Sequence, residues 1–440
     1  MTGTGSGAPT RSMRMTPICL FLATALCGSA GAVDVDYEVG VAAKRSDNVN
    51  LSEFDPISDT VISPRLYFEA DQSGSRVQLT AKGDFEYLHY TGDTFDDETR
   101  GRFAGSLNWQ VLPGHVDFVL QDYLSVLPVD ELVPHSPTNL QQVNVLMAGP
   151  TLHARFHPTT RGRLDLRYVN SHAEESDDFN SDRYAAAARL IHDINAGHSV
   201  SANVEATDIR FDRAGTASDY RRYDGYATSE MRRKQFDLGA DLGYTRLELD
   251  NTNDHSSYPL ARVRLDWRLS PRSLLGTTLR YQVSDATQSL MEPLAFQRRA
   301  FNDFDILYGL VEPSVFRERL IRARYEYRGE RTDLQVAPYY RRIRYIEDVI
   351  ESQDRRGARL ALDYRLRPRL TLSLLASAEN REYVGIARQD KDRLASIGLA
   401  NRFTRHWTGR IDLQRRERDS SADGRSYDEN AVMVSFSYQR

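Results

Sequence analysis

Arginine and aspartate recur at every second position in several segments of this 440-residue chain. Residues 261–269 show the pattern most clearly, because charged and apolar residues alternate there throughout. Side chains two positions apart lie on the same face of a β-strand, so the charges of each segment share one side. A row of arginine forks could bind the carboxylates of an acidic polymer. The same arginines could instead pair with aspartates across strands and stiffen the interior.

The charged residues of this phase are the candidate functional residues. We predict that they line one common interior surface, where their charge decides which molecules the surface attracts or excludes. The candidate lining residues are Arg163, Asp165, Arg167, Arg262, Arg264, Asp266, Arg268, Arg322, Arg324, Arg359, Asp363, Arg365, Arg367, Arg410 and Asp412.

Other residue types give no recognisable catalytic or metal-binding pattern. The 10 histidines lie mostly in expected turns, and none has the H-E-x-x-H spacing of a zinc site. No nucleophile elbow or glycine-rich phosphate loop is present. We therefore predict no enzyme activity, no cofactor and no metal ion. A hydrolase that pairs a serine and a histidine between neighbouring strands is a less favoured alternative, with Ser201 and His192 as the pair to inspect.

The elements that position these charges are predicted to be β-strands. Period-two alternation recurs along residues 33–438, without a helical period, and divides into about 20 strands of roughly 10 to 15 residues. Short turns of about four residues alternate with longer loops, one of them at residues 389–392. This alternation is typical of outer-membrane barrels and unexplained in a soluble sandwich. We predict an all-β fold: a single transmembrane antiparallel β-barrel of about 18 to 20 strands, with short periplasmic turns and long extracellular loops.

In such a barrel the apolar face meets lipid and the charged face lines the lumen. An arginine on the lipid face at the bilayer midplane costs about 2–4 kcal/mol, so the strict alternation indicates which side of each strand points inward. The alternation is less clear in residues 183–189, where an alanine run separates two arginines. Residues 288–313 are too aromatic for a plain loop. The sequence leaves three alternatives for this segment: a lid, an in-folded plug or two further strands.

The first 32 residues resemble an export signal. Arg11 and Arg14 precede an apolar stretch at residues 17–27, and Ala30–Gly31–Ala32 follows as a cleavage site. We therefore divide the chain into a signal peptide at residues 1–32 and a barrel at residues 33–440. This predicts the outer membrane of a Gram-negative bacterium, with the lipid bilayer and the barrel assembly machinery as partners.

Cysteine usage and net charge exclude several further roles. Both cysteines, Cys19 and Cys27, lie inside the expected signal, so the mature chain would have no disulfide and no thiolate metal site. The formal net charge of −5 gives no support for nucleic-acid binding.

Residues 139–150, with the sequence NLQQVNVLMAGP, resemble a signature of the PEP-CTERM-system-associated outer-membrane protein family. Residues 45–49 and 61–66 are similar to the same group, which overlaps the β-barrel porins of exopolysaccharide gene clusters. The likeness extends over essentially the mature chain. One departure is that Gln439 and Arg440 follow Tyr438, whereas many barrels end on an aromatic residue.

The resemblance implies an outer-membrane barrel linked to surface polysaccharide. The expected function is a porin-like conduit or scaffold in exopolysaccharide export, with an anionic exopolysaccharide and periplasmic export components as partners. A general diffusion porin is the alternative.

Overall fold

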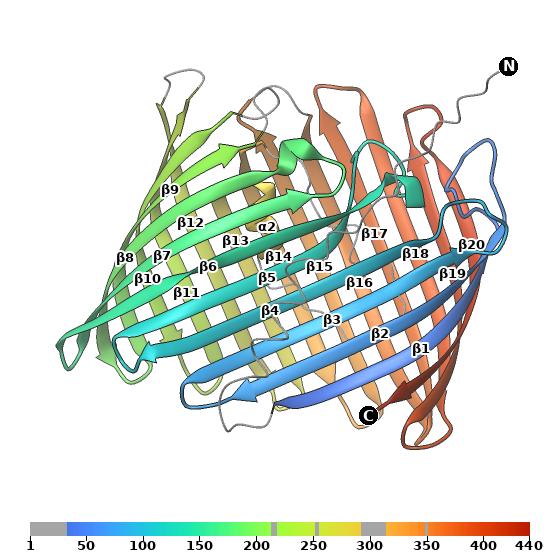
Figure 1. Cartoon of the computed structure of the whole chain (residues 1–440), viewed down its shortest axis with the longest axis horizontal. Helices are drawn as coiled ribbons and strands as arrows, with labels where there is room; N and C mark the ends of the chain where they lie inside the picture. The colour runs from blue at the N-terminus through green and yellow to red at the C-terminus, as the bar shows by residue number, and fades with distance from the viewer. Residues whose placement is uncertain (1–32, 213–217, 251–254, 292–313, 348–350) are drawn as a thin grey trace, which may run out of the picture.

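One antiparallel sheet of 20 strands closes on itself in the computed structural model (Figure 1). The structure describes residues 33–212, 218–250, 255–291, 314–347 and 351–440, so the expected signal and most of the segment 288–313 lie outside the described residues. Closure comes from the pairing of the first strand with the last, in which Val41 lies opposite Phe436. The predicted antiparallel barrel is confirmed.

Each strand pairs with its neighbours in chain order, and every segment predicted as a strand forms one. The strands are β1 (Asp34–Ser46), β2 (Asp59–Ser73), β3 (Val77–Tyr90), β4 (Glu98–Leu112), β5 (Val116–Pro128), β6 (Leu140–His157), β7 (Thr160–Ala173), β8 (Ser181–Asn195), β9 (His198–Phe211), β10 (Tyr220–Arg232), β11 (Phe236–Leu249), β12 (His255–Ser270), β13 (Ser273–Ser284), β14 (Phe316–Arg328), β15 (Thr332–Tyr345), β16 (Ser352–Arg367), β17 (Leu370–Val384), β18 (Arg388–Arg402), β19 (Trp407–Ser420) and β20 (Tyr427–Gln439).

The connections alternate in length as expected, with one exception between β17 and β18. The predicted loop at Gln389–Asp392 is wrong, because these residues belong to β18. The two strands stay paired as far as Tyr383 and Arg388, and the chain reverses between them. Gly385 has a φ of +116°, a conformation that glycine adopts without a side-chain clash and that permits this tight reversal.

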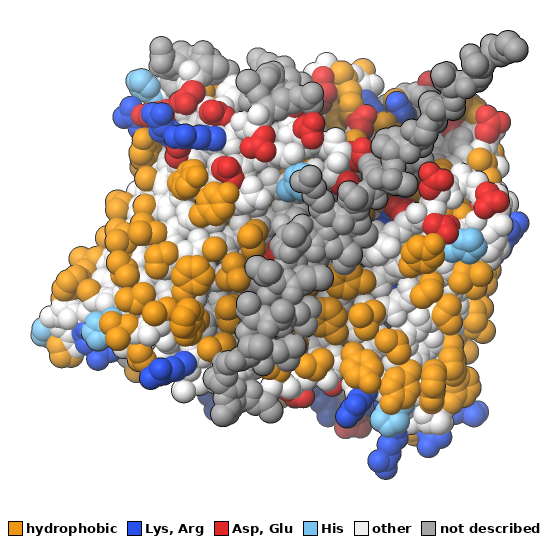
Figure 2. Space-filling view, viewed as in Figure 1, with side chains coloured by type: hydrophobic (Ala, Val, Ile, Leu, Met, Phe, Trp, Pro, Cys, Tyr) orange, Lys and Arg blue, Asp and Glu red, His pale blue; other side chains and the backbone are white. Residues whose placement is uncertain are grey.

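Apolar side chains form a belt around the outside of the barrel. Val204, Leu242 and Ile321 leave 61%, 64% and 56% of their surface exposed, which in water would be unfavourable over so wide an area. Figure 2 shows hydrophobic side chains as a broad band, with acidic side chains gathered above it. The three tryptophans all lie on outward positions near the short turns, at Trp109, Trp267 and Trp407. An apolar belt with an aromatic edge fits a lipid bilayer.

The described part of the chain has only short helices, and none of them is long and apolar enough to cross a membrane.

Candidate channel lumen

Seven of the predicted lining residues surround one cavity of about 1390 Å³ inside β10 to β17. They are Arg262, Arg264, Asp266, Arg268, Arg322, Arg324 and Arg359. The described residues that line this cavity include eleven arginines but only five carboxylates, an excess of six positive charges within the lining itself. Glu318 and Glu131, outside this lining, pair with three of the arginines, Arg280, Arg341 and Arg355. The chain as a whole has a net charge of −5, so the wall of this cavity is more positive than the rest of the chain.

Most of these arginines are paired with carboxylates rather than free. Arg262 lies 2.9 Å from Asp241, and Arg268 lies 2.5 Å from Asp237. Each pair joins β12 to β11, so the ion pairs also tie neighbouring strands together. Arg264 is different, because its side chain is exposed to the lumen and forms no ion pair with any described residue. It is therefore available to a ligand.

The other predicted lining residues form two clusters and a pair near the short turns. On β7, Asp165 accepts from Arg163 at 2.9 Å and from Arg167 at 3.1 Å. On β19, Arg410 lies 2.6 Å from Asp412. The remaining residues lie on β16: Asp363, which accepts from Ser373 at 2.7 Å, and Arg365 and Arg367, which are exposed near the turn to β17.

The connection between β5 and β6, residues 129–139, reaches across the lumen, and we call it the crossing loop (Figure 1). It ends in a short 3-10 helix, η1 (Pro137–Asn139). The Asn139 amide donates to the carbonyls of Asp130 at 2.8 Å and Pro134 at 3.1 Å, and its oxygen accepts from the Asp130 N–H at 2.9 Å. These bonds give the loop a defined shape before it contacts the opposite wall.

The crossing loop is fastened to strands far away around the barrel. Arg355 on β16 donates to the Glu131 carboxylate at 2.7 Å, and Gln353 donates to the same oxygen at 3.0 Å. The Arg355 side chain is only 3% exposed, so the pair is screened from water. Two further arginines donate to loop carbonyls: Arg388 to Leu132 at 2.8 Å and Arg418 to Val133 at 3.5 Å.

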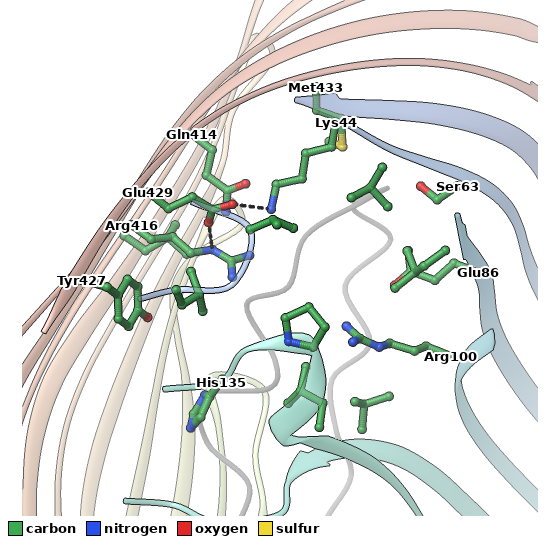
Figure 3. Close-up of a pocket in the computed structure, with 18 of the residues that line it drawn as sticks. Lys44, Ser63, Glu86, Arg100, His135, Gln414, Arg416, Tyr427, Glu429 and Met433 are labelled. Atoms are coloured by element: carbon green, nitrogen blue, oxygen red, sulfur yellow. Dashed lines mark ion pairs between the residues drawn. The ribbon is translucent and has the colours of Figure 1, made fainter. Parts of the chain in front are cut away.

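His135 lies on the crossing loop, beside the wall that carries Arg416, Tyr427 and Glu429 (Figure 3). Both of its ring nitrogens are buried and have no hydrogen-bond partner among the described residues. Burial, and then the positive charge of Arg418 and neighbouring arginines, hold the pKa of His135 well below its usual value of 6.5. The docked loop therefore contains a neutral histidine.

This histidine predicts a pH-dependent release of the crossing loop. Above pH 6.5 His135 is neutral whether the loop is docked or free, so it has no effect. Below that pH His135 takes up a proton in the free loop but stays neutral in the docked loop. Docking is therefore weakened by up to about 1.4 kcal/mol per pH unit. We expect larger and noisier single-channel currents as the pH falls from about 7.5 to about 5.5. The His135→Gln variant should lose this dependence, and an unchanged pH profile in that variant would contradict the assignment.

A second element folds into the barrel at the end of β13. Asp285 accepts from the Arg183 guanidinium and the Tyr220 hydroxyl, both at 2.8 Å, and from the Gln288 N–H at 2.9 Å. It thereby begins the short helix α2 (Ala286–Met291). Burial alone would raise the pKa of Asp285, but the charge and hydrogen bond of Arg183 hold it below its ordinary value.

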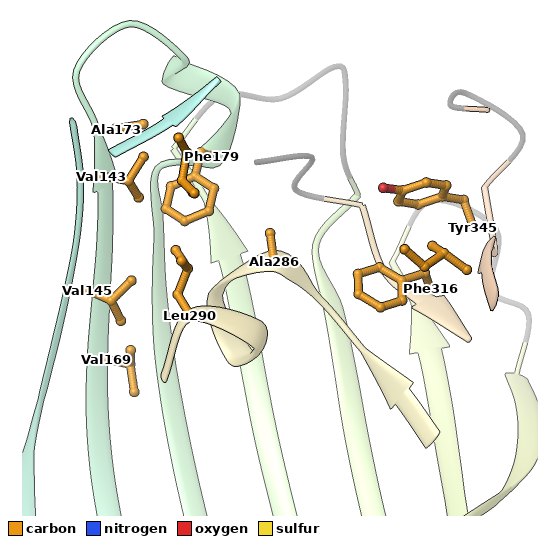
Figure 4. Packing of buried hydrophobic residues seen from close by; sticks show 11 residues of the cluster. Val143, Val145, Val169, Ala173, Phe179, Ala286, Leu290, Phe316 and Tyr345 are labelled. Atoms are coloured by element: carbon orange, nitrogen blue, oxygen red, sulfur yellow. The ribbon is translucent and has the colours of Figure 1, made fainter. Parts of the chain in front are cut away.

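Helix α2 is packed against the inner wall by apolar contacts (Figure 4). Ala286 and Leu290 are 0% and 5% exposed and belong to a buried cluster with Val143, Val145 and Phe179. The only described part of the segment 288–313 thus lies in the interior. Residues 292–313, for which a lid, a plug and two further strands are the alternatives, lie outside the described residues.

Sequence reasoning missed the residues that fasten these two elements. Glu131 was not among the predicted site residues, although it follows Asp130 in a proline-containing loop. Arg355 and Arg418 share the inward phase of the predicted residues on their strands, and extending that phase toward the loop ends would have found them. The sequence that carried the family resemblance begins at Asn139, the residue that shapes the crossing loop.

The serine–histidine pair considered for a hydrolase does not form. Ser201 lies opposite Ile191 in the register of β8 and β9, while His192 lies opposite Val200. Neighbouring register positions point to opposite faces of a sheet, so the two side chains are on different sides of the wall. The His192 ring contacts the Thr160 hydroxyl at 3.0 Å instead.

Residues 350–440, which include β16 to β20, match a protein-family model described as "Putative beta-barrel porin 2". This part of the chain is similar to a porin family. With the closed barrel and its outward apolar belt, the match supports a porin-like β-barrel of the outer-membrane type. A search of curated protein sequences found no match.

Solved outer-membrane proteins are similar to the chain at a low level. The FrpB iron transporter from Neisseria meningitidis (F3-3 variant) has 9% identity and a TM-score of 0.46, over 92% of this chain and 82% of that chain. The outer membrane protein opdK from Pseudomonas aeruginosa has 10% identity and a TM-score of 0.37, over 92% and 99%. A ferric enterobactin receptor (PfeA) mutant from Pseudomonas aeruginosa has 9% identity and a TM-score of 0.47, over 93% and 81%. These similarities are too distant to transfer what those proteins bind.

Proposed function

We propose that this barrel is a passive outer-membrane conduit for an anionic exopolysaccharide. The observation that carries the proposal is the excess of six positive charges on the wall of the main cavity, in a chain whose net charge is −5. Positive charge on a low-dielectric wall raises the local concentration of anions. A barrel with this number of strands is wide enough to hold an aqueous channel.

The mechanism is diffusion or threading of the polymer along the arginine-lined wall. Arg264 offers its guanidinium fork to a sugar carboxylate without breaking an ion pair. Paired arginines such as Arg262 are held in place by their carboxylates, and the positive potential comes from the excess of arginines over carboxylates on the wall. The crossing loop narrows the lumen, so its position decides how wide a chain can pass.

The similarity of residues 139–150 to the exopolysaccharide-associated family further supports a polysaccharide as the cargo. Periplasmic export components would then deliver the polymer to the short-turn end of the barrel. The barrel assembly machinery would insert the chain into the outer membrane.

A general diffusion porin is the second candidate. The observation that favours it is the pairing of lumen arginines with nearby carboxylates, as in Arg268 with Asp237 and Arg324 with Asp266. Such pairs leave fewer guanidinium groups for a sugar. A porin of this kind would pass small anions without distinguishing acidic from neutral oligosaccharides.

Planar-bilayer recording of the purified barrel tests the proposal. An oligouronate added to one side should block the current at lower concentration than a neutral oligosaccharide of the same length, because only the first is attracted by the arginines. Equal block by both sugars, or block by neither, would favour the diffusion porin. A barrel that does not conduct under any condition would exclude both candidates.

A single substitution tests the role of the free lumen arginine. The Arg264→Glu variant lowers the excess positive charge of the cavity wall from six to four, so we expect the anion-over-cation permeability ratio to fall by about twofold. The ratio follows from the reversal potential in a KCl gradient. Arg246→Gln is the matched control, because Arg246 lies on the outer face beside Glu248. An unchanged ratio in Arg264→Glu would exclude this residue from the conduction path.

A further inference from the structure

Four arginines form a cluster near the ends of β14 and β15 that lead to the long connections. The register places Arg319 opposite Arg342 and Arg317 opposite Arg344. Arg319 and Arg342 point outward, since the residues between the arginines, such as Glu318 at 1% exposure, are buried on the inner face. Arg317, nearer the rim, lies over the Tyr258 ring at 5.5 Å. We call this group the outer arginine cluster.

Neighbouring carboxylates compensate only part of the positive charge of the outer arginine cluster. Asp354 on β16 lies 3.1 Å from Arg342 and 2.7 Å from Arg344, so one carboxylate serves two arginines. Arg317 and Arg319 are exposed and form no ion pair with any residue in the described ranges. The four arginines and Asp354 together carry three excess positive charges.

Like charges that lie directly opposite one another destabilise a pair of strands. In water, solvent and salt screen much of this repulsion, but screening is weaker where the surface faces lipid. An anion bound from outside the protein would therefore lower the repulsion between Arg319 and Arg342. The bound anion would also pair with the Arg319 guanidinium, which forms no ion pair with a described residue.

The level of the cluster in the membrane indicates what that anion is. The next outward pair toward the middle of the barrel is Ile321 opposite Tyr340, and Ile321 belongs to the apolar belt. Arg319 lies over the Tyr281 ring at 5.0 Å, and Arg342 lies over the Tyr340 ring at 5.9 Å. Tyrosine rings at the edge of an apolar belt mark the headgroup level of a bilayer. The anions available at that level are lipid phosphates.

We propose that the outer arginine cluster binds the phosphate of a lipid headgroup in the leaflet at the long-loop end. The guanidinium fork of Arg319 contacts phosphate oxygens, and Arg342 and Arg344 approach from the facing strand while Asp354 holds their side chains in place. The lipid's acyl chains lie along Ile321 and the apolar belt below. This site faces away from the lumen and is independent of the proposed conduit function.

The chain contains a natural comparison group on the outer face of β9 to β11. Arg210 lies 2.9 Å from Asp208, and Arg246 lies 2.8 Å from Glu248. These arginines occupy the same end of the barrel and are also exposed. Asp208 also pairs with Arg221 at 3.4 Å, and Arg221 lies 3.9 Å from Asp250, so three carboxylates match the three arginines of this group. They should therefore have little affinity for a further anion.

Native mass spectrometry of the purified full chain in detergent tests the proposal. The probe is bisphosphorylated lipid A, compared with the same lipid after removal of both phosphates. The test variant combines Arg319→Gln with Arg342→Gln, and the control variant combines Arg210→Gln with Arg246→Gln. Heat-modifiable migration on gels and single-channel conductance show that each variant is folded and that its lumen is intact.

We expect the test variant to bind lipid A about tenfold more weakly or worse, and the control variant to bind it like the unmodified chain. The dephosphorylated lipid should bind the unmodified chain as weakly as lipid A binds the test variant, a comparison that needs no substitution. Equal binding of the two lipids, or of the two variants, would overturn the proposal. Displacement of lipid A by inorganic phosphate at equal concentration would also overturn it, because the cluster would then be a site for free anions.

Discussion

Exchanging Val263 and Arg264 is expected to abolish assembly of the barrel. Val263 lies on the outer face in the middle of β12, opposite Ala240 and Leu279, whereas Arg264 points into the lumen. The exchange places a guanidinium against lipid, at a cost of about 2–4 kcal/mol. This is a large fraction of the stability of an ordinary domain. We expect the exchanged variant to lose the heat-modifiable, protease-resistant form in membrane fractions.

Two matched variants separate the position of the charge from the change in composition. Arg264→Val removes the lumen charge but leaves the lipid face apolar, so it should assemble. Thr278→Lys adds a charge on the inner face of the neighbouring strand, at the register position of Arg264, and should assemble as well. Normal assembly of the Val263/Arg264 exchange would mean that the inner and outer faces are assigned the wrong way round.

Removing the Glu131 carboxylate is expected to free the crossing loop and widen the channel. Glu131→Ala leaves the Arg355 guanidinium buried, at 3% exposure, without its carboxylate. Breaking one partner of a buried ion pair costs about 3–5 kcal/mol, which is enough to shift the loop from mostly docked to mostly free. We expect a larger mean single-channel conductance and frequent current fluctuations in planar bilayers.

A double-mutant cycle shows whether the effect comes from this contact. Arg355→Ala should have the same phenotype, and the Glu131→Ala/Arg355→Ala double variant should differ little from either single variant, because both remove the same interaction. Glu330→Ala is the control, since this carboxylate is 84% exposed in a short turn. If Glu131→Ala conducts like the unmodified chain, the crossing loop does not limit the current.

Local sequence patterns were enough to predict the strands, the closed antiparallel architecture and the inward phase of the arginines. The alternation has a period of two, and it is strict because a charge against lipid costs several kcal/mol. The inner and outer faces of each strand can therefore be assigned from that strand's own sequence. The prediction was wrong where polarity was the only local signal. Gln389–Asp392 looked like a loop because of its charge, but Asp390 and Asp392 point inward as part of β18.

The sequence predicts which arginines share the inward phase, but not which carboxylates they pair with. Alternation shows that Arg264 points inward. It does not show that Arg264 lacks an ion pair, whereas Arg262 and Arg268 each have one. Pairing depends on register and rotamer, which place a carboxylate within reach of one arginine and not of the next.

The sequence alone therefore determined the barrel and the side of each strand that faces the membrane. Only the tertiary structure decided what narrows the lumen and where charge remains uncompensated. Glu131 and Arg355 are 224 residues apart, and Arg183 and Asp285 are 102 apart. Closing the sheet brings these residues together, because a strand's position around the barrel depends on every strand between, and no local pattern records it.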